Sequence, residues 1–121
     1  MKEIKRGEIY AVDFGTGCGS EQGGTRPSLI LQNDIGNRHS PTTIVAAITG
    51  RQTKAALPTH VAIMTSGLKT ESTVLLEQIR TIDKARLGEY IGRLDSKTLA
   101  AVDRAIVVSL GIKYLEGLLN G

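Results

Sequence analysis

Hydrophobic residues in the first two thirds of the chain form short runs, some alternating with polar residues and some continuously apolar, which are typical of β-strands. In GEIYAVDF (residues 7–14) the alternation sets Tyr10, Val12 and Phe14 on one face of a predicted strand. Short apolar runs, several rich in β-branched residues, predict four more strands at 28–33, 42–49, 59–63 and 72–82. Stretches rich in glycine, proline or polar residues are predicted as loops at 15–26, 34–41 and 50–58.

The period becomes helical near the C-terminus. Four apolar residues recur at helical spacing: Leu99, Val102, Ile106 and Leu110. They predict an amphipathic helix of about four turns. Asp95 or Ser96 is the predicted N-cap, and Gly111 falls near the end of the helix. The segment DKARLG (83–88) predicts a short helical turn before it.

Consecutive strands followed by one helix predict an α+β fold, with an antiparallel sheet that curls toward a barrel. A chain of 121 residues has the length of one domain, which we expect to span 1–121. With three tyrosines, one phenylalanine and no tryptophan, the core must consist of isoleucine, leucine, valine and alanine. The same scarcity argues against nucleic-acid binding on a platform of stacked aromatic rings.

Cysteine content and hydropathy indicate the compartment. Cys18 is the single cysteine, so no internal disulfide can form, and a reducing cytoplasmic setting is expected. No apolar run approaches the ~20 residues needed to cross a bilayer, and the basic N-terminus lacks an apolar stretch behind it. We therefore expect a cytoplasmic protein without a membrane anchor.

The net charge of +3 is modest, but it is unevenly placed. Residues 1–23 sum to −1, residues 24–60 to +3 and residues 61–121 to +1. The excess therefore follows the glycine-rich loop, where it would attract a polyanion, although a charge of this size also fits proteins that bind none.

The glycine-rich loop does not match a nucleotide-binding loop. A P-loop needs a Gly-Lys-Ser/Thr sequence opening a helix, whereas here Gly24 is followed by Thr25 and Arg26, and a strand follows. Glycines that only supply positive φ would explain the loop, but not the position of Arg26 directly before Pro27. Because proline restricts the preceding residue to extended geometry, the guanidinium is held at the strand entry, where it suits a phosphate.

Other reactive side chains lack a supporting pattern. His39 and His60 would suit a two-histidine ribonuclease, but nothing in the sequence brings them together, so a solvated or structural role is favoured. Cys18 has no accompanying His/Asp pattern and is interpreted as a small loop residue. Three carboxylates show no metal-ligand spacing, and no metal site is predicted at Glu21, Asp34 or Glu77.

Five short motifs carry a resemblance: RGEIY, GSEQGGTRP, ILQNDIGN, AAIT and LLEQIRTID. Together and in this order, over roughly residues 5–110, they resemble the MazF/PemK family of type II toxin–antitoxin ribonucleases. The resemblance implies an SH3-like barrel with a C-terminal helix, assembled as a homodimer. It also implies cleavage of single-stranded mRNA without metal or other cofactor, to a 2′,3′-cyclic phosphate and a 5′-hydroxyl. The implied partner is a cognate MazE-like antitoxin whose disordered C-terminal segment crosses the RNA groove.

The resemblance assigns roles to particular residues. The catalytic pair it implies is Arg26, in the loop-then-RP motif, and Thr49, at the end of AAIT. The implied substrate-binding residues are Ser20, Glu21, Gln22, Glu77 and Gln78. Gly50 and His39 match no family role.

The chemistry implied by the resemblance needs no nucleophile from the protein, because the 2′-hydroxyl of the RNA attacks its own phosphate. Arg26 would stabilise the charge on the phosphorane at every relevant pH, and Thr49 would donate a hydrogen bond to a non-bridging oxygen. The groups that carry the protons are not assigned. DNA lacks the 2′-hydroxyl, so RNA is the expected substrate.

Two other functions stay open at this point. One is a toxin of the same fold that binds and poisons DNA gyrase, as CcdB relatives do, which would need no phosphate site. The other is a catalytically silent RNA-binding module. Cleavage of a long RNA that survives EDTA would favour the nuclease, and intact RNA would favour the alternatives.

Overall fold

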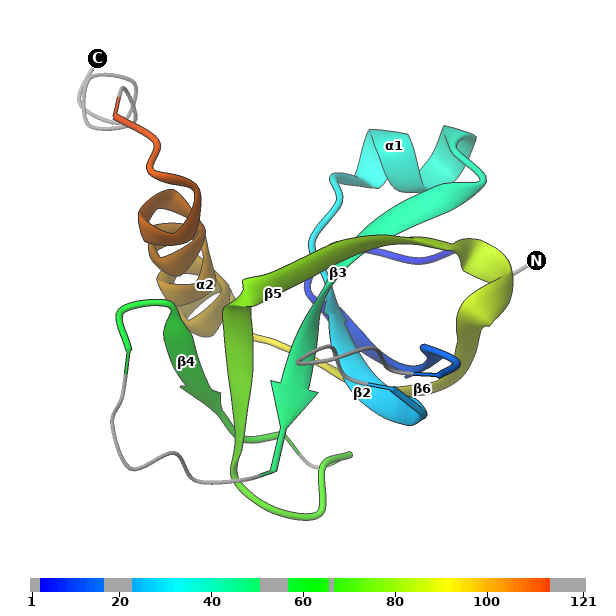
Figure 1. The fold of residues 1–121 in the computed structure, drawn as a ribbon, viewed down its shortest axis with the longest axis horizontal. Helices are drawn as coiled ribbons and strands as arrows, with labels where there is room; N and C mark the ends of the chain where they lie inside the picture. The colour runs from blue at the N-terminus through cyan, green and yellow to red at the C-terminus, as the bar shows by residue number, and fades with distance from the viewer. Residues whose placement is uncertain (1–2, 17–22, 51–56, 66, 114–121) are drawn as a thin grey trace.

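The fold is taken from a computed structural model, which describes residues 3–16, 23–50, 57–65 and 67–113. Six strands, two α-helices and one 3₁₀ helix make up this part of the chain (Figure 1). In chain order they are β1 (Glu8–Asp13), β2 (Thr25–Ile30), α1 (Asp34–His39), β3 (Thr42–Thr49), β4 (His60–Ile63), β5 (Ser72–Asp83), η1 (Lys84–Arg86), β6 (Leu87–Arg93) and α2 (Ser96–Leu110).

The six strands form one antiparallel sheet in the spatial order β4-β5-β3-β2-β1-β6. Its edge strands β4 and β6 do not pair with each other in the described part of the chain, so the sheet is open. Figure 1 shows the sheet strongly curled, with α2 beside β4 and β5. No helix among the described residues is long and apolar enough to span a membrane. The α+β class, the antiparallel sheet and the C-terminal helix are confirmed.

Both faces of the sheet are covered by apolar side chains. The face toward α2 carries a core of Ile9, Leu29, Leu31, Ala46, Ile48, Ile63, Val74, Leu76, Leu94, Val102 and Ala105. The opposite face, called the far face below, carries Ile4, Tyr10, Val12, Phe14, Ile30, Val45 and Ile82. Because the central strands β2 and β3 are buried on both sides, SLIL and IVAAI are continuous apolar runs rather than alternating ones.

A wide bulge interrupts β5. Adjacent residues Ala46 and Ala47 of β3 pair with Ile79 and Leu75 of β5, so three residues, 76–78, are inserted between the two pairs. An odd insertion reverses the alternation of side chains between the two halves of the strand. Arg80, which pairs with Val45, consequently lies on the far face.

The prediction of a loop at residues 34–41 is wrong, because Asp34–His39 form α1. Asn33 caps this helix, with its side-chain oxygen accepting a hydrogen bond from the N–H of Gly36 at 2.8 Å. A helix of six residues is too short to form alone. It is stabilised by the buried Asn37, whose side chain bonds to groups outside the helix.

Two strands also differ from expectation. β6 was not predicted, because two glycines and exposed side chains hide its pattern, and pairing with β1 stabilises it. β2 begins at Thr25 rather than at residue 28, so Arg26 lies within a strand and not in the loop before it. The remaining strands, the turn at 84–86 and α2, capped by Asp95 and Gly111, confirm the predictions.

Candidate functional site

Arg26 projects from β2 as an exposed side chain. It pairs across the ladder with Val12 of β1, and its Nε donates a hydrogen bond to the carbonyl oxygen of Gly23 at 3.1 Å. This bond uses one of the five N–H donors of the guanidinium. The four donors on the terminal nitrogens form a planar fork that suits the oxygens of a phosphate.

Thr49 is the last residue of β3 and is half-buried. The β2–β3 ladder pairs Ser28 with Ala47, and Pro27, which has no N–H to donate, precedes Ser28. That ladder ends at Ser28 and Ala47, so Arg26 and Thr49 each lie two residues beyond its last pair. Side chains two residues apart on a strand point to the same face of the sheet. Arg26 and Thr49, which the sequence predicted as a catalytic pair, therefore lie on the same face of neighbouring strands, the far face.

Ser28 lies two residues from Arg26 on the same face of β2. Its side chain is fully buried, and its hydroxyl oxygen has no hydrogen-bond partner in the described part of the chain. Leaving a buried hydroxyl unpaired costs about 1–3 kcal/mol, and such groups are uncommon in folded proteins. The other unpaired buried side-chain atom in the described part of the chain is Nδ1 of His60.

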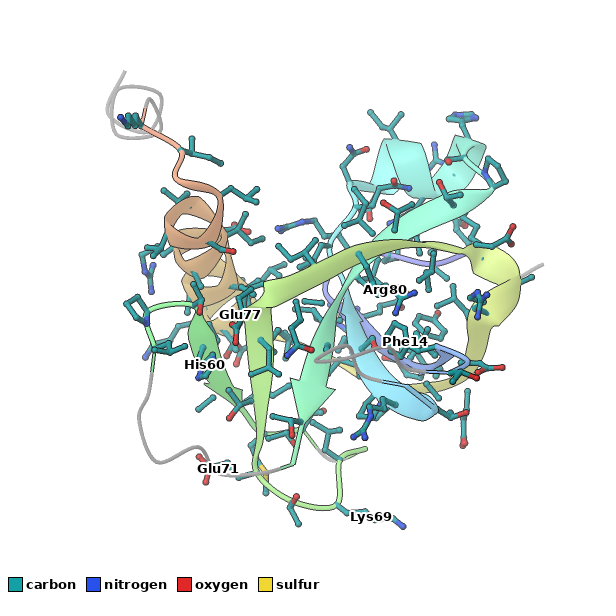
Figure 2. The ribbon with its side chains drawn as sticks, in the orientation of Figure 1. Phe14, His60, Lys69, Glu71, Glu77 and Arg80 are labelled. Atoms are coloured by element: carbon teal, nitrogen blue, oxygen red, sulfur yellow. The ribbon has the colours of Figure 1, made fainter. Side chains whose placement is uncertain are left out.

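Glu77 lies in the β5 bulge and contacts β4 rather than Arg26. Its Oε1 accepts a hydrogen bond from the Thr59 hydroxyl at 2.9 Å, and its Oε2 lies 2.9 Å from His60 Nε2. Partial burial alone would raise the pKa of the Glu77 carboxyl, but hydrogen bonds from His60, the backbone and Thr59 hold it below the ordinary value. Figure 2 shows Glu77 and His60 directed toward one another near α2, away from Arg80 and Phe14.

Of the other predicted substrate-binding residues, the structure describes only Gln78. Gln78 is half-buried in the bulge beside Glu77. Ser20, Glu21 and Gln22, like Cys18, lie outside the described residues.

The two histidines do not form a pair. His39 is exposed at the end of α1, whereas the side chain of His60 is 8% exposed and bonded to Glu77. The sequence favoured a solvated or structural role for both histidines, and the bond to Glu77 is the contact that the structure shows for His60. Among the described residues no group of three or more histidine, cysteine, aspartate or glutamate side chains is placed to hold a metal ion.

The basic segment 24–60 does not form one patch around Arg26. Arg38 lies on α1 and pairs with Glu3 at 3.6 Å. Arg51 and Lys54 fall outside the described residues. Near this end of the far face, a second positive charge comes from Arg80, which the sequence reasoning missed because the bulge that turns Arg80 to this face leaves no mark in the alternation.

A cavity of about 830 Å³ lies at the other end of the far face, between α1, η1 and the N-terminal segment. Tyr10 contributes to its wall and donates a hydrogen bond from its hydroxyl to Glu8 Oε1 at 3.3 Å. Burial and the neighbouring Glu8 charge raise the pKa of Tyr10 to about 12, so this tyrosine stays protonated at neutral pH.

Comparison with known proteins identifies relatives across nearly the whole chain. Residues 5–110 match a family model described as PemK-like, MazF-like toxin of type II toxin-antitoxin system. The chain is 54% identical over 111 residues to Endoribonuclease EndoA of Bacillus subtilis, covering 90% of this chain and 96% of that protein. It is 53% identical over 115 residues to Endoribonuclease MazF of Staphylococcus saprophyticus, covering 93% and 96%. A mycobacterial endoribonuclease solved in complex with its cognate antitoxin superimposes with a TM-score of 0.76 at 30% identity, covering 91% and 97%.

Proposed function

The chain belongs to the family of PemK-like, MazF-like toxins of type II toxin–antitoxin systems, and from that premise we propose that its endoribonuclease site is the Arg26–Thr49 pair on the far face. The observation that supports this proposal is the strand register, which puts Arg26 and Thr49 on the same face of neighbouring strands, with four guanidinium donors of Arg26 left unbonded within the described ranges. As a toxin of this kind the protein cuts single-stranded mRNA and so inhibits translation.

The proposed reaction uses the RNA as its own nucleophile. The 2′-hydroxyl attacks the adjacent phosphorus, the 5′-oxygen leaves, and a 2′,3′-cyclic phosphate and a 5′-hydroxyl end result. Arg26 stabilises the negative charge that develops on the phosphorane, and Thr49 donates a hydrogen bond to a non-bridging oxygen. Neither role needs a metal ion. Ser20, Glu21, Gln22 and Gln78 contact the bases, together with Glu77, whose side chain is 38% exposed.

The partners follow from the family and from exposed apolar surface. The mycobacterial neighbour is bound to its cognate antitoxin, and we expect a MazE-like antitoxin to bind here in the same way. Val108 and Leu110 near the end of α2 are 54% and 62% exposed, with Leu57 and Ile112 also exposed. These side chains support a homodimer, since burying them would remove apolar surface from water. Because mRNA and the antitoxin would both be met in the cytoplasm, we propose that the protein acts there.

The SH3-like barrel is part of the same proposal. It is supported by a close approach between the segment after β4 and strand β6. Thr65 lies so near Gly92 of β6 that a Cβ built on this glycine would be 2.9 Å from the Thr65 hydroxyl oxygen. The residues 1–121 would then form one toxin domain closed by side-chain contact at this seam.

Cleavage of a long single-stranded RNA by the purified protein, with and without EDTA, tests the function. We expect cleavage that survives EDTA, leaves DNA of the same sequence intact, and produces cyclic-phosphate ends. Arg26→Ala and Thr49→Val should each lower kcat, by about a hundredfold to a thousandfold for the loss of a transition-state donor. Arg104→Ala, which removes an exposed arginine of α2, is the matched control and should cleave normally.

Two results would contradict the proposal. Normal cleavage by Arg26→Ala would remove the assigned site. Intact RNA with the wild-type protein, combined with inhibition of DNA gyrase, would instead support a toxin of the CcdB type.

A further inference from the structure

Arg80 extends from β5 across the far face toward the end of β1. Its guanidinium carbon lies 4.8 Å from the centroid of the Phe14 ring. Figure 2 shows both side chains in the space between β5 and the strands β1 and β2. The ring face attracts the cation and fixes its position and plane, which an exposed arginine ordinarily lacks.

The edge of this guanidinium is unused. Arg80 is exposed, and within the described ranges no carboxylate lies within 4.0 Å of it and no hydrogen bond is formed by its N–H groups. A contact with a ring face leaves all five N–H donors in the guanidinium plane free. The side chain is held in place but not neutralised, an arrangement that suits an anion from outside the chain.

Arg80 and Arg26 flank the same short stretch of β1. Val12 pairs with Arg26, and Phe14, one residue past the end of β1, packs on the same face as Val12. Diagonal neighbours of this kind lie about 7–8 Å apart in a sheet. Because the Arg80 guanidinium lies over Phe14, it approaches the phosphate site of Arg26 from the β5 side. An extended polyanion bound at Arg26 can reach both guanidinium groups.

We propose that Arg80, held by Phe14, binds a phosphodiester of the RNA strand next to the one that is cleaved at Arg26. This inference rests on the proposed nuclease function and adds a second phosphate contact to it. Arg80 is thus a binding residue that fixes the strand in register with Arg26 and Thr49. A backbone contact carries no sequence information, so its removal weakens binding equally for all sequences.

The salt dependence of binding provides the test. The probe is a fully 2′-O-methylated single-stranded RNA of mixed sequence, which cannot be cleaved because its 2′-oxygens cannot attack. Binding is measured against NaCl concentration for wild type, Arg80→Ala, Arg80→Lys and the control Arg104→Ala. Each lost phosphate contact on a single strand reduces the slope of log K against log salt by about 0.7. We expect that reduction for Arg80→Ala, a retained slope for Arg80→Lys, and no change for Arg104→Ala.

Cleavage kinetics give a second measurement. Loss of one charge-assisted hydrogen-bonding group should raise KM for a cleavable RNA by about tenfold to a hundredfold. The kcat value should change by less than about threefold, because Arg26 and Thr49 are untouched. Phe14→Leu should raise KM by a smaller factor, since it removes the ring that fixes the guanidinium and leaves the charge.

Three results would overturn the inference. An unchanged slope and KM in Arg80→Ala would show that Arg80 binds no RNA. Relaxed preference at one base with an unchanged slope would make it a base contact instead. A lowered melting temperature without a change in slope would make it purely structural. Failure of the wild-type protein to cleave any RNA would refute the proposed function itself. That outcome can be told apart from a failure of the Arg80 inference, which shows only in the Arg80 variants.

Discussion

Replacing Asn37 with alanine should destabilise the fold more than any other polar substitution near α1. Asn37 is 3% exposed, and its Oδ1 accepts hydrogen bonds from the Thr43 hydroxyl at 2.7 Å and from Gln32 Nε2 at 3.1 Å. Its Nδ2 donates to the Gln32 carbonyl oxygen at 2.8 Å. The side chain therefore connects α1 to the start of β3 and to the end of the segment before the helix.

The magnitude follows from the groups that lose their partner. Asn37→Ala leaves the fully buried Thr43 hydroxyl and the Gln32 carbonyl unpaired, whereas Gln32 Nε2 keeps the Thr42 carbonyl at 3.0 Å. The fully buried Thr43 hydroxyl accounts for about 1–3 kcal/mol, and the carbonyl of the half-buried Gln32 adds to it, so we expect a loss of about 2 kcal/mol or more. For a chain of this size that corresponds to a fall in melting temperature of about 8 °C or more.

Urea unfolding followed by circular dichroism measures the loss. Thr43→Val is the matched control, because it removes the hydroxyl at nearly constant shape and leaves Asn37 Oδ1 bonded to Gln32. It should cost only about 1 kcal/mol. The double variant should be less destabilised than the sum of the singles, since the hydroxyl orphaned by Asn37→Ala is then gone. The reasoning is refuted if Asn37→Ala costs no more than Thr43→Val, or if the two effects add fully.

Three further predictions concern other parts of the molecule. The lowered pKa of Glu77 means that its contribution to stability is present above about pH 4.5 and is lost as the pH falls through the lowered value; Glu77→Gln should flatten the acid limb of a stability-against-pH curve, and an unchanged limb would contradict this. Gly67→Ala should lower the urea midpoint by an amount equivalent to about 2 kcal/mol or more, because a Cβ there would overlap the carbonyl oxygen of Ile91, and a midpoint equal to wild type would show that the seam between β4 and β6 yields easily. Asp95→Ala should lower the melting temperature by removing the acceptor of the Thr98 N–H, 2.7 Å away, whereas Asp95→Ser should retain most of it, and equal losses in the two variants would argue against a capping role.

Local patterns predicted the elements whose stability is largely local or whose period is regular. The strands at 7–14, 42–49 and 72–82 alternate or are continuously apolar, and α2 has both an apolar stripe and caps at its ends. The helix α1 was mistaken for a loop, because Gly36 and Pro41 suggested a break. Its stability comes from contacts of Asn37 with residues before and after the helix, which no local window contains.

The site was predictable only in part, for a similar reason. Arg26 was identified by its proline neighbour, and Thr49 through the family resemblance. That both lie on one face of the sheet depends on the strand register between β2 and β3, which the sequence does not state. Glu77 was expected at the substrate, and its bonds to His60 and Thr59 depend on β4 lying beside β5. Arg80 was missed because simple alternation along 72–82 would have assigned it to the other face.

The bulge in β5 decides which face of the sheet the following side chains point to. That outcome depends on whether the number of inserted residues is odd or even, and not on how large the number is. If the following strand shifts in register, deleting one residue between Leu75 and Ile79 would move Arg80 to the position of Ile79, toward the helix-covered core, and adding one would move Ile79 to the exposed position of Arg80. A shift of two residues would leave both side chains on their present faces. Homologous sequences and engineered chimeras should therefore tolerate the insertion of two residues here better than the insertion of one.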